Sequence, residues 1–183
     1  MGGATVATQY IASEKGVIAL VPGAFTAAVG TETGSIEDLK VEARPSGIRV
    51  IESRIKKDES VNIETAEVLV AVGQGLNSKD DLAMIEKLAC VLGGEVACSK
   101  PLATDRKWLS EERVIGLSGK KCKPELAILL GISGQVQFMV GIRDARVIVS
   151  VNSDENACIN QLADYVLLAD LYDVVPQLNA ALG

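Results

Sequence analysis

The sequence contains no histidine among its 183 residues. This absence excludes histidine metal ligands, Ser/His/Asp and Cys/His nucleophile pairs and an imidazole general base. Aromatic residues are also scarce, at 3% of the chain, whereas hydrophobic residues make up 48% and glycine occurs 17 times. This composition is typical of an aliphatic α/β core with tight backbone turns, and not of an aromatic-rich β-sandwich.

Long apolar stretches and an excess of positive charge are missing as well. No apolar run approaches the ~20 residues of a membrane span, and no basic segment followed by an apolar stretch opens the sequence. We therefore expect neither a membrane span nor secretion. The formal net charge is −6, from 18 basic and 24 acidic residues, which argues against nucleic acid as a partner because nucleic acid selects clustered lysine and arginine.

The four cysteines, Cys90, Cys98, Cys122 and Cys158, are widely spaced and form no Cys-x-x-Cys pair. We interpret them as small buried hydrophobic residues in a reducing cytoplasm, and we expect no zinc or redox site. The sequence also lacks a paired-carboxylate motif, and its serines have no base. We therefore expect no catalytic residue and no metal ligand, so that any chemistry belongs to a cofactor.

The first part of the chain shows short β-like runs separated by glycine and proline turns. These runs cover residues 5–11, 16–21, 40–43 and 48–54. No helix-length periodic segment lies between them, so the ribbons have no helical layer to pack against. We expect this part to be a piece of a larger fold.

From about residue 60 the pattern changes to alternating strands and helices. Strands are predicted over 66–72, 95–99, 126–130, 146–151 and 165–168, and helices over 82–92, 135–140, 159–163 and 171–182. This alternation predicts βαβ units in a doubly wound, mainly parallel sheet. Ligands of such sheets bind beyond the carboxyl ends of the strands.

Three predicted strand ends carry residues suited to a ligand: 73–78, 131–134 and 151–154. The first is an incomplete Gly-x-Gly-x-x-Gly motif with Ser78 at the last glycine, and its alternative interpretation is a turn with a serine N-cap. The second suits a phosphate cradle, or is a capped turn. In the third, Asn152 is a candidate to read a sugar or base edge, although asparagine is also common in turns. Together the three predict a dinucleotide ligand.

Residues 126–141 and 148–152 resemble the signature segment of the electron transfer flavoprotein α subunit. Residues 70–78, 116–120, 124–126, 163–165 and 169–176 agree with the same family, and the resemblance runs in order from residue 60 to 183. Residues 2–3 and 21–25 also resemble the tail of that family's N-terminal domain. The resemblance therefore implies an FAD-binding α/β domain at 58–183, preceded by a β-rich remnant of an N-terminal domain at 1–57.

The implied function is that of an electron carrier, not an enzyme. The cofactor would be FAD, the partner subunit an electron transfer flavoprotein β subunit in a heterodimer, and the electrons would pass from flavin dehydrogenases to a downstream acceptor. Two alternatives stay open. One is a related domain that binds NAD(P) for hydride transfer; the other is a non-redox paralogue that binds AMP or serves as a partner scaffold.

The resemblance also implies positions for cofactor-binding residues. Ser99 and Lys100 match a Ser-Arg pair near the pyrimidine side and N5 edge of the isoalloxazine, and Gly116, Leu117 and Ser118 match a Gly-Gln-Thr loop at the ring. The remaining matches are Ser133, Gly134, Gln137 and Phe138 for the pyrophosphate, ribityl chain and ring O2, Asn152, Asp170 and Leu171 for the adenosine half, and Gln74 in the Gly-Arg-Gly turn.

Several of these positions depart from the family pattern. Gln74 replaces an arginine, Lys100 replaces another arginine, Leu117 replaces a glutamine, and Phe138 replaces a histidine that donates to the flavin O2. A lysine keeps the charge of arginine but loses its planar fork. Because an O2 donor and one cation are removed from the ring environment, we expect a lower flavin reduction potential or weaker FAD affinity than is usual in the family.

Other conspicuous residues have simpler interpretations. Asp80 and Asp81 form a favourable charge pair at a helix N-terminus. Trp108 is a candidate to stack on a ligand, but a lone tryptophan more often covers a hydrophobic core.

Overall fold

The computed structural model describes residues 8–20, 25, 30, 35, 38, 40, 47–53 and 61–183. The chain divides into two units, one made of Met1–Gln9 and Ser60–Gly183 and the other of Tyr10–Glu59. The second of these units is described only in part. The predicted domain boundary between residues 57 and 58 stays a prediction.

The predicted β runs near the start of the chain contain no strand where the structure describes them, at residues 8–11, 16–20, 40 and 48–53. The other residues of these runs lie outside the described part. Apolar side chains of the described residues are open to solvent, with Val17 98% exposed and Ile51 95% exposed. A β-like sequence pattern forms a strand only when a neighbouring strand pairs with it and a second layer covers its apolar side chains.

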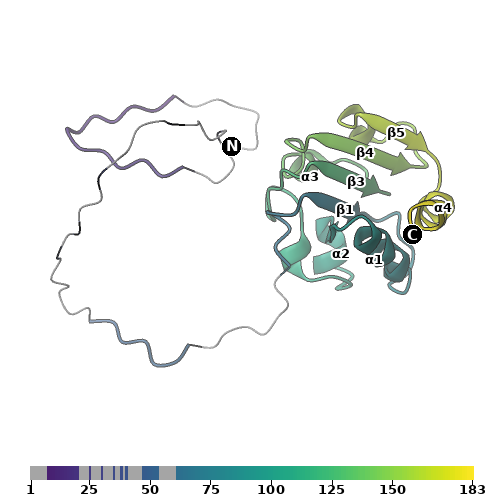
Figure 1. The fold of residues 1–183 in the computed structure, drawn as a ribbon, viewed down its shortest axis with the longest axis horizontal. Helices are drawn as coiled ribbons and strands as arrows, with labels where there is room; N and C mark the ends of the chain where they lie inside the picture. Colours follow the sequence, from purple (N-terminus) through teal and green to yellow (C-terminus); the bar gives the residue numbers. More distant parts are fainter. Residues whose placement is uncertain are drawn as a thin grey trace. The chain divides into compact units, whose positions relative to one another are not determined.

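Five parallel strands form the sheet of the larger unit (Figure 1). Their bounds are β1 Val68–Val72, β2 Glu95–Cys98, β3 Leu126–Leu130, β4 Val147–Asn152 and β5 Tyr165–Leu168, in the spatial order β2-β1-β3-β4-β5. Val72 at the end of β1 pairs with Cys98 and with Leu130. The ends of these three strands are therefore level, which brings the loops that follow them together.

The helical segments are α1 Leu82–Val91, α2 Lys100–Thr104, the 3-10 turn η1 Glu111–Arg113, α3 Val136–Met139, the 3-10 turn η2 Cys158–Gln161 and α4 Leu171–Leu182. The predicted helix over 159–163 is thus a 3-10 turn. The sequence prediction missed α2 and η1. Pro101 reads as a helix breaker, but it lies in the first turn of α2, where proline is tolerated because its missing N–H has no helical partner.

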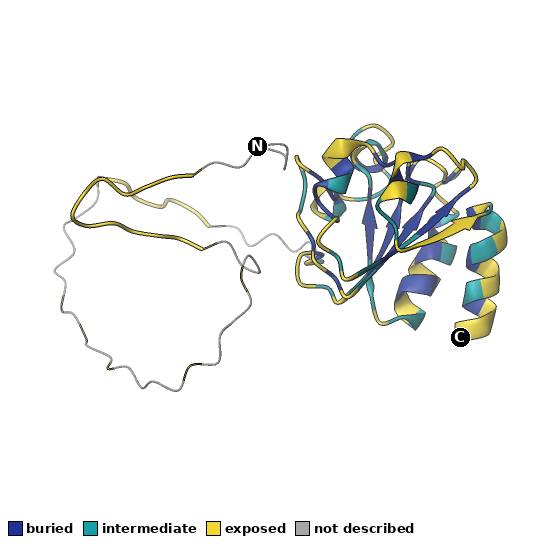
Figure 2. Ribbon diagram, turned by 90° about the horizontal axis from the view of Figure 1, so that it is seen from above, coloured by how far each residue is buried: buried dark blue, intermediate teal, exposed yellow. Residues whose placement is uncertain are grey.

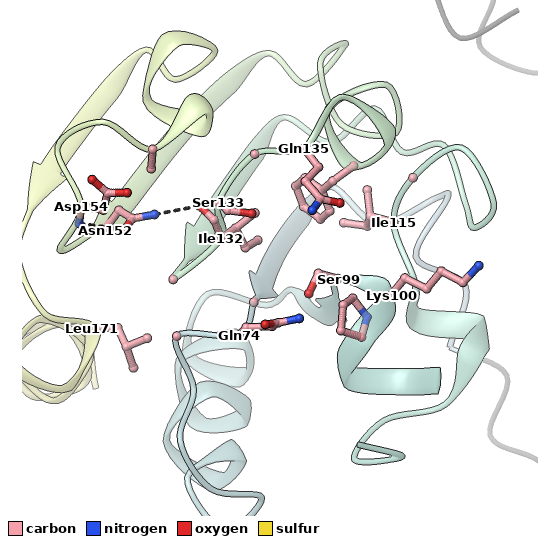
Figure 3. A pocket seen from close by; sticks show the side chains of 18 of the residues that line it. Gln74, Ser99, Lys100, Ile115, Ile132, Ser133, Gln135, Asn152, Asp154 and Leu171 are labelled. Carbon is pink, nitrogen blue, oxygen red and sulfur yellow. Dashed lines mark hydrogen bonds between the residues drawn. The ribbon is translucent and has the colours of Figure 1, made fainter. Parts of the chain in front are cut away.

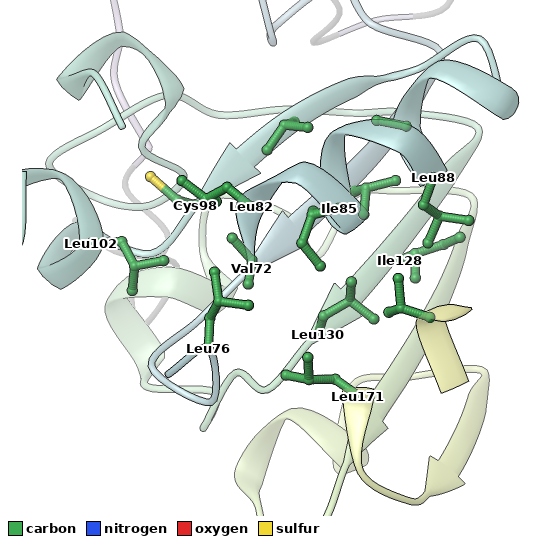
Figure 4. Close-up of a cluster of buried hydrophobic side chains, with 14 of the residues drawn as sticks. Val72, Leu76, Leu82, Ile85, Leu88, Cys98, Leu102, Ile128, Leu130 and Leu171 are labelled. Atoms are coloured by element: carbon green, nitrogen blue, oxygen red, sulfur yellow. The ribbon is translucent and has the colours of Figure 1, made fainter. Parts of the chain in front are cut away.

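Alternating side chains of the strands build two hydrophobic layers, one on each face of the sheet. Val70 and Val72 point to the face covered by α1 and α4 (Figure 4), whereas Leu69 and Ala71 point to the face covered by Phe138 and Ile159. The buried strands lie between these layers in Figure 2. The predicted doubly wound α/β fold is confirmed, with three layers and an all-parallel sheet.

The edge strand β5 differs from the other four because all its residues are exposed. The described part of the chain provides no cover for its apolar side chains. No helix among the described residues is long and apolar enough to cross a membrane.

Candidate functional site

A pocket lies at the carboxyl ends of the strands (Figure 3). The loops after all five strands contribute to it, together with residues 115–118. The cavity volume is about 870 Å³, within the ~300–1,000 Å³ that is usual for small-molecule and cofactor sites. The position agrees with the rule that open parallel sheets bind ligands where their strands end.

All the residues that the sequence resemblance assigned to a cofactor line this one pocket: Gln74, Ser99, Lys100, Gly116, Leu117, Ser118, Ser133, Gly134, Gln137, Phe138, Asn152, Asp170 and Leu171. They come from positions as far apart in the sequence as 74 and 171. Their contacts with a cofactor stay a prediction. Tyr172 also lines the pocket, although it was not predicted as a site residue.

The glycines after β1 are required by the close approach of two loops. A Cβ atom at Gly73 would meet the carbonyl oxygen of Gly131, and one at Gly75 would lie 2.8 Å from the Gly131 Cα. The N–H of Gly75 donates to the Gly131 carbonyl at 3.0 Å. These glycines are thus explained by packing between the loops after β1 and β3. The N-cap residue of α1 is Asp81, and Ser78 lies three residues earlier, where its hydroxyl accepts from the N–H of Asp80 at 3.3 Å.

The first three carbonyl groups of the loop after β3 accept hydrogen bonds from neighbouring segments of the protein. The Gly131 carbonyl accepts from Gly75, the Ile132 carbonyl from the Asn152 side chain at 2.7 Å, and the Ser133 carbonyl from the N–H of Ile159 at 3.2 Å. By contrast, the backbone N–H groups of residues 132–137 have no partner in the described part of the chain. Consecutive N–H groups of this kind form an anion-binding concavity.

Gly134 allows this loop to turn. Its φ is +83°, and a Cβ atom there would collide with the N–H of Ile159. Any L-residue would therefore meet both backbone strain and a clash with backbone at this position.

Asn152 bridges two loops of the pocket wall (Figure 3). Its Nδ2 donates to the Ile132 carbonyl, and its Oδ1 accepts from the N–H of Asp154 at 3.0 Å. The residue is 7% exposed. Asn152 thus holds the shape of the pocket wall through both ends of its carboxamide, and its predicted contact with a ligand stays a prediction.

The other end of the pocket combines apolar side chains with the polar residues Ser99, Lys100 and Ser118. Phe138 is 6% exposed and packs in the same hydrophobic layer as Ile115 and Ile132, while Leu117 is 52% exposed. The N–H of Leu117 donates to the Gln137 carbonyl at 2.8 Å, which ties the 115–118 loop to α3.

Ser99 offers an unused hydrogen-bonding group near that end, because its hydroxyl is buried without a partner among the described residues. An unpaired buried hydroxyl costs free energy that a ligand can recover. Lys100 is the only basic residue among the pocket-lining residues, which also include Asp105, Asp154 and Asp170. With a single cation in the lining, recognition of a phosphate depends mainly on neutral donors, namely backbone N–H groups and side chains such as that of Ser133.

The cysteines lie outside this chemistry. Cys98 and Cys122 are buried as predicted, but Cys90 and Cys158 are exposed, since they fall on the outer sides of α1 and η2. Burial raises the pKa of the Cys98 thiol and of the Cys122 thiol to about 12. The described residues contain no cluster of acidic, cysteine or histidine side chains able to hold a metal.

Trp108 packs against the hydrophobic layer under α1, and it does not line the pocket. The Arg106 guanidinium lies 4.6 Å from the centre of its ring and donates to the Leu76 carbonyl. The interpretation that Trp108 covers the hydrophobic core is therefore confirmed.

Fold and pocket together define a three-layer α/β domain with a pocket of cofactor size at the ends of its parallel strands. Residues 62–143 match the family described as electron transfer flavoprotein FAD-binding domain. Protein FixB of Escherichia coli strain UMN026 and Protein FixB of strain HS are each 37% identical to this chain over 184 aligned residues. The alignment covers 100% of this chain and 59% of each relative, so the chain spans little more than half their length. The resemblance to the electron transfer flavoprotein α subunit is confirmed.

Proposed function

We propose that the pocket holds FAD and that the chain acts as the FAD-binding part of an electron transfer flavoprotein α subunit. It would carry electrons from flavin dehydrogenases to a downstream acceptor, as half of a heterodimer with a β subunit. The isoalloxazine ring supplies the redox chemistry when FAD is bound. The chain's own residues bind, orient and shield the cofactor.

The observation that carries this proposal is the loop at residues 132–137. Its N–H groups are free of partners in the described part of the chain, and its carbonyls other than that of Gly134 accept hydrogen bonds from elsewhere in the protein. This polarity fits a pyrophosphate, whose oxygens only accept hydrogen bonds, and does not fit a ligand group that needs acceptors. Because the lining holds a single lysine, neutral donors such as these N–H groups carry much of the proposed phosphate recognition.

The proposed orientation of FAD is the one that the family resemblance implies. Ser99, Lys100, Leu117 and Phe138 lie on the side that we assign to the ring, and Phe138 is the buried apolar side chain among them. Asp170 and Leu171 lie at the end of β5, on the side that we assign to adenosine. The unpartnered Ser99 hydroxyl is available to a polar edge of the ring.

Phe138 sets the expected redox property of this site. Its ring offers no hydrogen-bond donor, and it is buried among aliphatic side chains. A low-polarity wall without a donor disfavours negative charge on a neighbouring group. We therefore propose that flavin here has a lower reduction potential or a weaker affinity than in family members with histidine at this position.

We further propose that the protein works in the cytoplasm. The described cysteines are free thiols, two of them exposed, which suits a reducing compartment.

The test is electron transfer by the chain reconstituted with FAD and a β subunit. A reduced flavin dehydrogenase should bleach the flavin absorption bands, and an acceptor should restore them. A chain that binds NAD(H) and takes up no flavin under these conditions would support the hydride-transfer alternative. One that binds AMP alone, or no nucleotide, would support the non-redox alternative.

A further inference from the structure

Tyr172 connects the first turn of α4 to the loop after β1. Its hydroxyl accepts from the N–H of Asn77 at 2.8 Å and donates to Asp81 Oδ2 at 2.6 Å. The same Asp81 oxygen accepts from the N–H of Ser78 at 3.1 Å. One hydroxyl and one carboxylate thus join segments about 90 residues apart in the sequence.

These bonds hold two walls of the pocket. Asn77 and Gly75 belong to the loop after β1, whereas Leu171 and Tyr172 belong to the start of α4, and all four line the pocket. Asp170 is fixed at the same place, because its Oδ1 accepts from the N–H of Tyr172 at 2.9 Å. Asp81 itself does not line the pocket.

We propose that Tyr172 and Asp81 are positioning residues that hold the adenosine side of the pocket in its binding geometry. The inference rests on the proposed function, because it assumes that an adenine nucleotide occupies this side. Without the hydroxyl, the Asn77 N–H and the Asp81 carboxylate lose a shared partner, and α4 is no longer tied to the glycine loop. A misplaced wall then weakens ligand binding although no contact atom has been removed.

The donor in this arrangement is stable over the physiological pH range. Burial and the hydrogen bond to Asp81 raise the pKa of the Tyr172 hydroxyl above its ordinary value. The phenol therefore stays protonated, and the hydrogen bond to a carboxylate is of the stronger, charge-assisted kind.

The test is calorimetric titration of the full chain with AMP, with the melting temperature measured in parallel. Tyr172→Phe should weaken AMP binding about tenfold. Tyr165→Phe removes the same hydroxyl from exposed β5 and should leave the affinity unchanged. Asn179→Ala removes the donor to the Met84 carbonyl at another α1–α4 contact. It should lower the melting temperature and leave AMP affinity within about twofold.

Variants of Asp81 separate positioning from direct contact. Asp81→Ala should weaken AMP binding about tenfold, although the residue does not line the pocket. Asp81→Asn keeps an oxygen acceptor and should restore most of the affinity. These variants also provide the answer if Tyr172→Phe fails to fold.

The outcomes distinguish this inference from the proposed function. Wild-type protein that binds neither AMP nor FAD would overturn the proposed function and this inference with it. Wild-type protein that binds AMP, with unchanged affinity in both Tyr172→Phe and Asp81→Ala, would overturn the positioning role alone. An equal loss in Asn179→Ala would also overturn it, because general loosening of α4 would then explain the effect.

Discussion

Asn152 Nδ2 donates to the carbonyl oxygen of Ile132 at 2.7 Å, which joins the end of β4 to the loop after β3. This bond keeps the Ile132 carbonyl turned into the protein. The N–H groups at 132–137, which have no partner among the described residues, depend on that arrangement, because a released carbonyl would place an acceptor where phosphate oxygens are expected to bind.

Asn152→Ala should therefore weaken FAD binding and lower the free energy of unfolding by about 1–3 kcal/mol, the cost of leaving a buried carbonyl unpaired. Fluorescence titration with FAD and urea unfolding measure the two effects. Asn156→Ala, in the same loop but exposed, serves as the matched control and should change neither. Full FAD affinity in Asn152→Ala would show that the loop does not need this bond.

Two glycines with positive φ separate backbone strain from a clash. Gly93 has φ +65° and open space where a Cβ would lie, whereas Gly134 has φ +83° and no room for a Cβ. Gly93→Ala should cost about 1 kcal/mol from strain alone. Gly134→Ala should cost more than about 2 kcal/mol and also abolish FAD binding. Urea unfolding of both variants measures the difference, and equal costs would contradict the close packing against Ile159.

The environment of the flavin ring is tested by Phe138→His. A donor at this position should make the flavin reduction potential more positive by about 30 mV, which corresponds to ~1.4 kcal/mol for a two-electron couple, or should tighten FAD binding. Redox titration of the reconstituted protein measures the shift. Since burying an imidazole in this layer costs stability, Leu117→Gln on the exposed loop is a second variant that should act in the same direction. Unchanged potential and affinity in both variants would contradict the hypothesis.

Thiol accessibility distinguishes the four cysteines. Cys98 and Cys122, with pKa values of about 12, should stay unreactive toward Ellman's reagent at pH 8, whereas exposed Cys90 and Cys158 should react. In the unfolded chain the buried thiols ionise near their ordinary pKa of 9.0. Their contribution to stability is therefore complete below pH 9 and is lost as the pH rises toward 12. Rapid reaction of all four thiols in folded protein would contradict the observed burial.

The sequence predicted the sheet and the place of the pocket because both depend on local patterns. Apolar runs such as 126–130 and the periodic residues of α1 are strong local signals. The glycine-rich strand ends led to the right edge of the sheet. Edge strand β5 shows the limit of this reasoning, since its apolar run does not reveal that its residues are exposed.

Relationships between distant residues could not be predicted in this way. Asp81 was interpreted as a helix-terminal charge, but its carboxylate accepts from Tyr172, which lies 91 residues further along the chain. Asn152 was selected as a ligand contact from its place after a strand, and its two hydrogen bonds within the protein were not foreseen. Neither bond has a sequence signature, because each depends on how loops from different strands meet.

The central claim is that this chain binds FAD through the loop at 132–137. Its most direct test is the absorption spectrum of the chain after reconstitution with FAD and a β subunit and removal of unbound flavin. We predict flavin absorption bands with about one FAD per chain. A colourless protein, reconstituted under conditions in which the β subunit has bound, would contradict the account.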